Sequence, residues 1–363
     1  MEWIASDGVD ARTPPRPLRV ALGPTDVAGT SSALASGLRA NGVDVEVVVW
    51  KPGHPFGFRA DRELGRAGRA LYGLAVPGRR DVLHFQYGTT WLPRALDARW
   101  ARLWGRTLVV GYHGDDCRLA AVVAREGWPL AELDVVRDDD AVAERMRRIA
   151  MLVDAAVVAD FELVSYVREY FRRVYVIPHP VAPVEPPAPR LERATRIVLH
   201  APSDPVVKGT ELIAAAVQRV AARRPLEFRL LTGVPHAEVR EALATADVLV
   251  DQLRSATASM LALEAMGHGV PVLSRVDPRA FASFHDGLPV VPVTPDSLER
   301  ELEVLLDDPE RRRELGERGR AYVAATHGAE RVAAAMLRVY EHARSGPPGV
   351  YELTGTELEK RSD

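Results

Sequence analysis

Residues 196–222 read RIVLHAPSDPVVKGTELIAAAVQRVAA and carry the pattern that decides the fold. A short apolar run rich in β-branched residues ends at His200, and a polar loop follows it. From Glu211 to Ala222, apolar residues recur with helical spacing. A buried strand, a loop and an amphipathic helix form the repeating unit of parallel α/β sheets, so this stretch predicts one such unit.

The same alternation continues along the chain in both directions from this unit. Strands are expected over 18–22, 44–50, 81–86, 107–112, 155–159 and 174–178, and again over 196–200, 227–231, 247–251, 270–274 and 288–293. Helices are expected over 30–41, 211–222, 237–244 and 261–267, with a last helical pattern over 311–344. The two groups are separated by a tract dense in proline, which is stiff and cannot join the interior of a sheet. The sequence therefore predicts two doubly wound α/β domains that bind ligands in the cleft between them, at the carboxyl ends of their strands.

Shifts in composition divide the chain into six parts. We expect a flexible N-terminus (1–16), an N-terminal domain (17–178), a proline-rich connector (179–194), a C-terminal domain (195–327), a C-terminal helix able to cross back to the N-terminal domain (328–345) and a polar tail (346–363). The helical pattern is expected to end at Gly346, because Pro347 and Pro348 follow it.

The composition excludes several classes of protein. The chain has 363 residues and a formal net charge of −3, so no bulk attraction to nucleic acid or to an anionic membrane is expected. The single cysteine, Cys117, cannot form an internal disulfide, which favours a reducing compartment. The sequence shows no signal-peptide core and no run of about 18 apolar residues. We therefore expect a cytoplasmic protein with no nucleic-acid partner and at most peripheral membrane contact.

One segment is locally basic. Between residues 51 and 106 there are 11 basic and 4 acidic residues, a surplus of 11 − 4 = +7. Arginines on solvated helix faces explain such a surplus more often than a ligand does. The alternative is an anionic acceptor or contact with anionic lipid.

Two loops of the N-terminal half follow predicted strands. The first, GPTDVAGTSS (23–32), offers backbone N–H groups at a helix start, where an anion or a sugar hydroxyl can bind; a simple capped turn is the alternative. It lacks the GxGxxG spacing of dinucleotide-binding loops. The second, GYHGDDCR (111–118), places His113 where the cleft is expected. A structural hydrogen-bonding role is the more common one for a lone histidine. Asp115 and Asp116 have no companion ligands, so we predict no required metal, and Cys117 is expected to be a bystander.

Two features of the C-terminal half suit a nucleotide. Lys208 precedes a predicted helix, so its charge adds to the positive helix end and can hold a diphosphate, although a solvated loop lysine is the alternative. Glu264 lies inside the otherwise apolar helix of the segment EAMGHGVPV (264–272). An ionised carboxylate there needs partners, and a functional role competes with a structural one.

The combination of Lys208-Gly209 with the EAMGHGVPV segment resembles the donor-binding half of family-4 glycosyltransferases, which have the two-Rossmann GT-B fold. The resemblance spans nearly the whole chain. It also includes the Gly29-Thr30 loop, the strand DVLHF (81–85), the HGD segment at His113, the IPHPV connector (177–181) and the end of the chain from AYV (321–323) to Tyr340.

The resemblance implies a nucleotide-sugar donor, with a UDP- or GDP-sugar expected, and a small-molecule, lipid-linked or glycan acceptor. By resemblance, Lys208 neutralises the diphosphate and Glu264 holds the ribose hydroxyls. Gly29, Thr30 and His113 face the transferred sugar, and His113 and Lys208 are the expected catalytic residues. Donor contacts are also implied for Gly209, Thr257, Ala258, Ser259 and Met260. Family members generally retain anomeric configuration without a metal or another cofactor, and the leaving phosphate helps to deprotonate the acceptor.

Two positions depart from the family pattern. The glutamate expected eight residues before Glu264 is Ala256, and the arginine expected five residues before Lys208 is Ser203. Arg254 or Arg275 can in principle replace the lost cation. A non-catalytic homologue that binds a nucleotide sugar or scaffolds a partner enzyme is therefore the alternative function. A sugar-nucleotide epimerase of the same fold is a third, for which the sequence offers no evident extra acid–base carboxylates.

Overall fold

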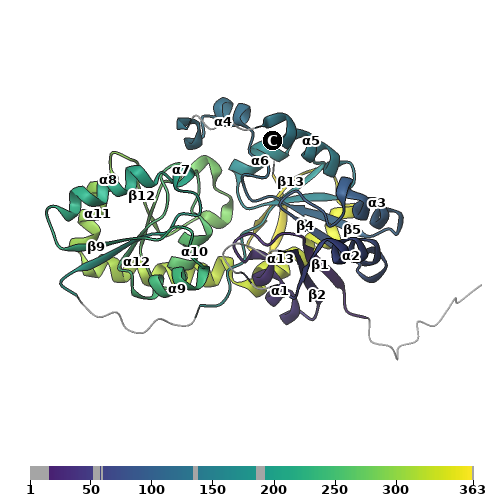
Figure 1. Cartoon of the computed structure of the whole chain (residues 1–363), viewed down its shortest axis with the longest axis horizontal. Helices are drawn as coiled ribbons and strands as arrows, with labels where there is room; N and C mark the ends of the chain where they lie inside the picture. The colour runs from purple at the N-terminus through teal and green to yellow at the C-terminus, as the bar shows by residue number, and fades with distance from the viewer. Residues whose placement is uncertain (1–15, 52–57, 59, 134–137, 185–192, 362–363) are drawn as a thin grey trace, which may run out of the picture.

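The computed structural model describes residues 16–51, 58, 60–133, 138–184 and 193–361. It contains two α/β domains, each with a parallel sheet between helices, and the domains lie next to each other along the long axis of the molecule (Figure 1). The predicted pair of doubly wound domains is confirmed. The expected flexible segment 1–16, except for Arg16, and residues 185–192 of the proline-rich connector lie outside the described residues.

The N-terminal domain is built on a nine-stranded sheet with the order β14-β13-β7-β6-β5-β4-β1-β2-β3. All neighbouring strands are parallel except β13 and β14, which are antiparallel. The central strands are rich in valine and buried on both faces, as parallel strands covered by helices must be. The strands are β1 (Arg19–Gly23), β2 (Asp44–Trp50), β3 (Arg62–Leu64), β4 (Val82–Gln86), β5 (Thr107–Gly111), β6 (Ala155–Val158), β7 (Arg173–Val176), β13 (Gly349–Thr354) and β14 (Glu357–Lys360).

The C-terminal domain has a five-stranded parallel sheet with the order β12-β11-β10-β8-β9. Its strands are β8 (Arg196–His200), β9 (Leu226–Leu230), β10 (Val248–Val250), β11 (Val272–Ser274) and β12 (Val290–Pro292). In both sheets the strand order reverses beside the first strand of the domain, which is the place where doubly wound sheets bind ligands.

Helices cover both faces of both sheets. Those of the N-terminal half are α1 (Thr30–Ala40), α2 (Arg66–Arg79), α3 (Leu96–Leu103), α4 (Ala120–Glu126), α5 (Asp139–Ala150) and α6 (Phe161–Val167). Those of the C-terminal half are α7 (Pro205–Lys208), α8 (Thr210–Ala221), α9 (His236–Thr245), α10 (Met260–Gly267), α11 (Leu298–Asp307), α12 (Pro309–Tyr322) and α13 (Ala329–Ser345). Among the described residues, no helix has the length and apolar character needed to cross a membrane.

The last helical pattern is two helices rather than one. A π-helical turn (Val323–His327) follows α12, and the chain then leaves helical geometry at Gly328 before α13 begins. Helix α13 packs on α1 of the N-terminal domain. The contact is close at Gly37 of α1, where a Cβ atom would stand 2.0 Å from the carbonyl oxygen of Ala329, so only glycine fits there.

The expected polar tail over 346–363 is wrong. Strand β13 pairs with β7, and β14 pairs with β13. The segment therefore adds two strands to the edge of the N-terminal sheet. Tyr351 and Leu353 are buried, and the carboxylate of Glu352 accepts a 2.6 Å hydrogen bond from Arg361. Because the charged Glu352 lies between the apolar Tyr351 and Leu353, the segment did not have the continuous apolar run that predicts a buried strand. Strand β3 was also missed, because its three residues give no periodicity to recognise.

Candidate functional site

A cavity of about 570 Å³ opens between the two domains. It is lined by residues that follow the carboxyl ends of strands in both sheets, among them His113 after β5, Lys208 after β8 and Asp251 after β10. Its volume lies in the usual range for small-ligand sites. Seven of the ten predicted site residues line it, namely His113, Lys208, Thr257, Ala258, Ser259, Met260 and Glu264.

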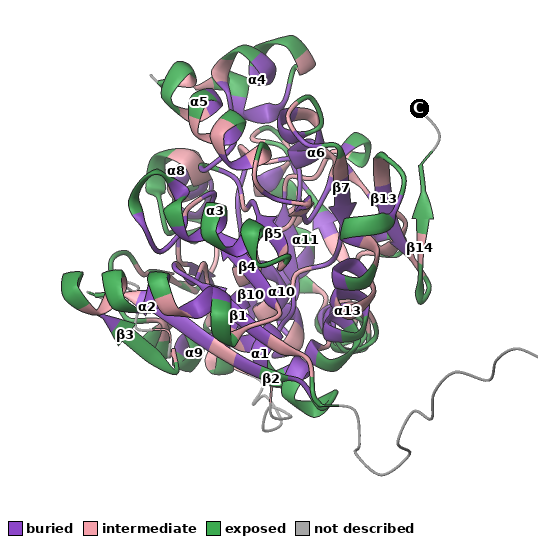
Figure 2. Cartoon of the chain, turned by 90° about the vertical axis from the view of Figure 1, so that its right-hand side faces the viewer, coloured by how far each residue is buried: buried purple, intermediate pink, exposed green. Residues whose placement is uncertain are grey.

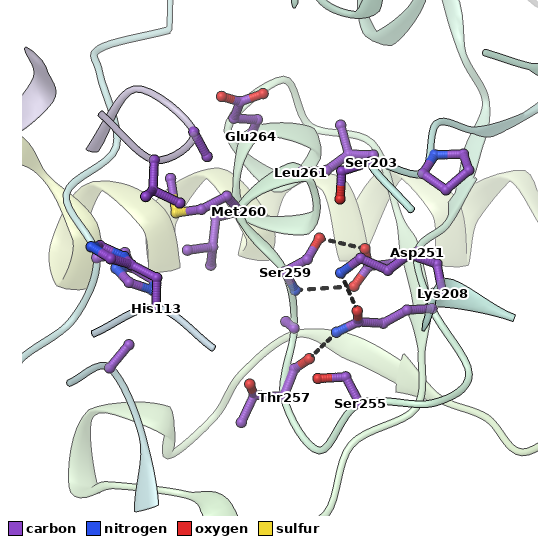
Figure 3. Close-up of a pocket in the computed structure, with 18 of the residues that line it drawn as sticks. His113, Ser203, Lys208, Asp251, Ser255, Thr257, Ser259, Met260, Leu261 and Glu264 are labelled. Carbon is purple, nitrogen blue, oxygen red and sulfur yellow. Dashed lines mark hydrogen bonds between the residues drawn. The ribbon is translucent and has the colours of Figure 1, made fainter. Parts of the chain in front are cut away.

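Lys208 sits at the end of α7, immediately before α8. The Asp204 side chain caps α7 by accepting hydrogen bonds from the backbone N–H groups of Val206 (2.9 Å) and Val207 (3.1 Å). The Lys208 ammonium donates a hydrogen bond to Gln252 Oε1 (Figure 3). Burial lowers the pKa of Lys208 below its ordinary value, although the carboxylate of Asp251 acts in the opposite direction. A partly desolvated cation of this kind favours an anionic ligand.

Gly209 does not line the cavity. Its φ of 75° turns the chain from α7 into α8, in the left-handed region that glycine adopts without strain. Its observed role is therefore to place Lys208 at the start of α8.

The buried carboxylate of Asp251 organises the start of α10. It accepts hydrogen bonds from Ser259 N (3.0 Å) and Ser259 Oγ (2.5 Å) (Figure 3) and from Ser274 Oγ (2.9 Å). Ser259 in turn caps α10 through Ala262 N. Within the described chain, the N–H groups of Met260 and Leu261 have no acceptor, as expected for the first turn of a helix. Free N–H groups at a helix start, close to a lysine, are suited to a phosphate.

Glu264 has the partner that its place in an apolar helix required. His236 Nε2 of α9 lies 2.9 and 2.8 Å from its two carboxylate oxygens. The ring of Phe58 lies 4.6 Å from the His236 ring, between centroids, so an N-terminal aromatic residue reaches this pair. Both oxygens of Glu264 keep lone pairs for a further donor, such as a ribose hydroxyl.

His113 is half-buried and is held by a chain of polar side chains. Its Nε2 lies 2.7 Å from Gln86 Oε1, while Gln86 Nε2 lies 3.3 Å from His84 Nε2. His84 Nδ1 then lies 3.0 Å from the hydroxyl of Tyr340 on α13. Since the amide oxygen of Gln86 can only accept, the proton of neutral His113 is on Nε2, and its Nδ1 is an acceptor. Burial lowers the pKa of His113 to about 4, so the ring is neutral at pH 7. It stacks on the His179 ring, with centroids 5.5 Å apart.

The two aspartates after His113 have different surroundings. The buried carboxylate of Asp116 accepts hydrogen bonds from His113 N (3.0 Å) and Gly114 N (2.8 Å) and so fixes the loop. Asp115 lines the cavity. Cys117 is fully buried as a free thiol. Within the described ranges, no group of three or more histidine, cysteine or acidic side chains is arranged to hold a metal ion.

Gly29 and Thr30 do not reach the main cavity, although Val27 and Ala28 before them do. Gly29 caps α1 in the left-handed region, with a φ of 74°, and a Cβ atom there would stand 2.8 Å from the ring of Phe58. The Thr30 hydroxyl donates a 2.7 Å hydrogen bond to the carbonyl of Val27. Thr30 faces a smaller neighbouring cavity of about 40 Å³ that it shares with His113.

The two positions that depart from the family pattern, Ala256 and Ser203, have different surroundings. Ala256 is fully buried and does not line the cavity. The next residue, Thr257, donates a 3.0 Å hydrogen bond to Asp160, which caps α6 of the N-terminal domain. Burial raises the pKa of Asp160 to about 7, with the neighbouring charge of Glu162 acting in the same direction. This bond joins the two domains at the base of the cavity.

Both arginines that could replace the cation missing at position 203 already form ion pairs. Arg275 forms a 2.7 Å ion pair with Glu132 of the N-terminal domain. Arg254 does line the cavity, as Ser203 does, but its guanidinium pairs with Glu211 at 2.5 Å. A diphosphate would have to compete with Glu211 for Arg254.

Sequence reasoning missed the residues that hold the others in place. They are Gln86, His179, His236, Asp251 and Gln252. A signal existed for three of them, because Gln86, Asp251 and Gln252 are polar residues at the ends of buried strands. The pairing of His236 with Glu264 had no such signal, since it depends on how α9 and α10 pack.

Comparison with known proteins agrees with this architecture. Residues 215–338 match a family described as glycosyl transferase-like. Sucrose-phosphate synthase from Thermosynechococcus elongatus is 16% identical, with a TM-score of 0.58 over 89% of this chain and 98% of that chain. The Anabaena protein HepE, solved with UDP-glucose, is 9% identical, with a TM-score of 0.58 over 89% and 99%.

A third similar structure is WaaG, a glycosyltransferase involved in lipopolysaccharide biosynthesis, which is 14% identical with a TM-score of 0.56 over 91% of this chain and 100% of that one. A search of curated proteins gave no match to the chain. By its fold the chain is a GT-B protein, and its residues 215–338 are similar to the glycosyl transferase-like family.

Proposed function

We propose that this protein transfers a sugar from a nucleoside-diphosphate donor to an acceptor, with retention of configuration and without a metal. One observation carries the proposal. The cavity brings Lys208 and the start of α10 from one domain together with His113 from the other. An anion-binding element and a polar group from the opposite wall are what transfer from a diphosphate sugar needs.

Each group has a task in this reaction. Lys208 and the N–H groups of Met260 and Leu261 hold the diphosphate and stabilise the charge that it gains as it leaves. Glu264 binds the ribose hydroxyls while it keeps its bond to His236. His113 accepts a hydrogen bond from the transferred sugar through Nδ1. The departing phosphate takes the acceptor proton, in line with the family resemblance.

The ligands of similar structures favour a UDP-sugar as the donor over sugars of other nucleotides. HepE of Anabaena is described in complexes with UDP and with UDP-glucose. TarM of S. aureus, with a TM-score of 0.51 and 10% identity, is described with UDP. We therefore propose a UDP-sugar or, second, a GDP-sugar, and a small-molecule, lipid-linked or glycan acceptor. We place the reaction in the cytoplasm, because the single cysteine is a free thiol.

A donor panel tests this function. The protein is incubated with UDP-, GDP-, ADP- and TDP-sugars and a mixture of acceptors, and released nucleoside diphosphate is measured. NMR of the product then gives the configuration at the anomeric carbon. Donor-dependent release with retention supports the proposal, whereas an inverted product contradicts its stereochemical part.

A specific observation favours the alternative of a binding protein without turnover. Ala256 stands where the family has a sugar-binding glutamate, and it is buried away from the cavity. The panel separates the two functions, because a binding protein gives saturable nucleotide-sugar binding and no release with any acceptor.

Activity is expected to survive EDTA. Asp115 and Asp116 have no companion ligands with the spacing or number that a tightly held divalent ion requires. Initial rates are compared before and after chelation and dialysis. A loss of turnover that magnesium or manganese restores would remove metal independence from the proposal.

Glu264→Gln should weaken binding of a nucleoside diphosphate by about 5- to 30-fold and leave its 2′,3′-dideoxy analogue nearly unaffected. The amide still accepts from His236 but loses the charge that strengthens the ribose hydrogen bonds. Isothermal titration of both ligands measures the selectivity, and Glu238→Gln, on the exposed side of α9, is the matched control. Equal weakening of both ligands would make Glu264 a structural residue.

A further inference from the structure

Large apolar side chains are exposed together at one end of the N-terminal domain. Among the described residues, ten large hydrophobic side chains are exposed, and six of them belong to α2, α3 and the residue after α3. Leu71 and Leu103 are the most open of the six, with exposed fractions of 72% and 79%. We call this surface the α2–α3 face; its apolar members are Leu71, Leu74, Leu96, Trp100, Leu103 and Trp104. Large apolar side chains exposed together on neighbouring helices are typical of an interaction site.

These side chains lie on neighbouring helices. Leu96, Trp100 and Leu103 are spaced by four and three residues, which puts them on one side of α3. Helix α2 packs against α3, and Trp104 lies against Gly78 of α2, where a Cβ atom would be 3.7 Å from its ring. Figure 2 looks onto this end of the molecule, where exposed stretches of both helices are visible.

The charge of the α2–α3 face has a single sign. Helix α2 contains three arginines and no acidic residue. The one acidic residue of α3, Asp97, is buried and accepts a 2.7 Å hydrogen bond from Trp91 N. Arg66, Arg79, Arg94 and Arg99 are exposed, and none of them forms an ion pair or side-chain hydrogen bond with any described residue.

An ordinary solvated helix face looks different, and this chain provides an example. Between α8 and α11 of the C-terminal domain, Arg219 and Arg223 pair with Glu299 and Glu303. Basic side chains at and just after the end of α8 and acidic side chains of α11 lie side by side there, so each arginine has a carboxylate partner. The α2–α3 face instead combines unpaired arginines with exposed leucine and tryptophan.

We propose that the α2–α3 face binds the surface of a lipid bilayer that contains anionic headgroups. Arginine pairs with lipid phosphate, tryptophan favours the headgroup region, and leucine enters the boundary of the acyl chains. A second copy of the chain is a poorer partner, because a two-fold interface would bring the same arginines against each other. The face does not line the interdomain cavity, so this inference does not rest on the proposed function.

Flotation with lipid vesicles tests the proposal on the full chain. Vesicles of phosphatidylcholine alone are compared with vesicles of phosphatidylcholine and phosphatidylglycerol. Two double variants weaken the face, Trp100→Ser with Leu103→Ser and Arg66→Glu with Arg99→Glu. Matched controls elsewhere on the surface are Leu230→Ser with Val304→Ser and Arg168→Glu with Arg240→Glu.

The expected result is binding to the anionic vesicles that falls with added salt. Each face variant should lose about 10-fold or more of this binding, while the controls bind as the wild type does. All variants should keep the wild-type circular dichroism spectrum. The proposal is overturned if the wild type ignores anionic vesicles or if the controls lose as much binding as the face variants. It is also overturned if light scattering shows that the face variants dissociate an oligomer, since the face then joins protein copies.

Discussion

His113→Ala should reduce turnover by about 10- to 1,000-fold, with little change in affinity for the nucleoside diphosphate. The imidazole lies across the cavity from Lys208 (Figure 3), so its loss removes a contact to the transferred sugar and none to the phosphates. Turnover per folded molecule and diphosphate affinity are measured on the same preparation.

The structure adds a second effect to this variant. Removing His113 leaves the buried oxygen of Gln86 without its partner, which costs about 1–3 kcal/mol of folding stability. His342→Ala is a suitable control, because His342 is also partly buried and bonded to one side chain, Tyr175, but lies outside the cavity. A destabilised His113 variant with normal turnover per folded molecule would make this residue structural only.

Lys208→Ala should weaken nucleoside-diphosphate binding by about 10- to 100-fold, since a charge-assisted bond to phosphate is lost. The fold should stay intact, but the buried oxygen of Gln252 loses its donor, so the variant should also lose about 1–3 kcal/mol of folding stability. Calorimetry with the diphosphate measures the loss, and Lys360→Ala on β14 is the control for a general change of charge. Equal affinities for wild type and variant would exclude Lys208 from the site.

The fold was predictable where the pattern was local. Short apolar runs rich in valine and leucine between polar loops predicted the central strands of both sheets, because strands buried on both faces are mostly apolar. Strand β13 was not predictable in this way. Its Glu352 is buried because two distant groups bond its carboxylate: Arg361, which follows β14, and the backbone N–H of Ser283.

The candidate site was predictable to a similar degree. His113, Lys208 and Glu264 were found because strand ends and helix starts meet at one edge of each sheet. The groups that orient them were not found. His113 depends on Gln86, His84 and Tyr340, a chain of contacts that runs from β4 to α13 and spans 256 residues of sequence. Such contacts follow from the packing of distant elements, which periodicity does not reveal.

The predicted roles of Gly29 and Gly209 illustrate another limit. Both residues have positive φ angles and lie at helix starts, as a binding loop requires, yet neither lines the main cavity. A glycine in a turn shows that the backbone bends there. Whether the bend faces a ligand depends on the neighbouring side chains, here Phe58 beside Gly29.

The most direct test of the account is a thermal-shift titration of the wild type and of Lys208→Ala with UDP, GDP, ADP, TDP and their sugars. A ligand present at about 100 times its dissociation constant adds roughly 2.7 kcal/mol of stability, which is readily visible as a rise in melting temperature. The account predicts that at least one nucleoside diphosphate and its sugar stabilise the wild type and that the same concentrations stabilise Lys208→Ala much less. No stabilisation by any of these ligands, or equal stabilisation of both proteins, would contradict a nucleotide-sugar site at Lys208.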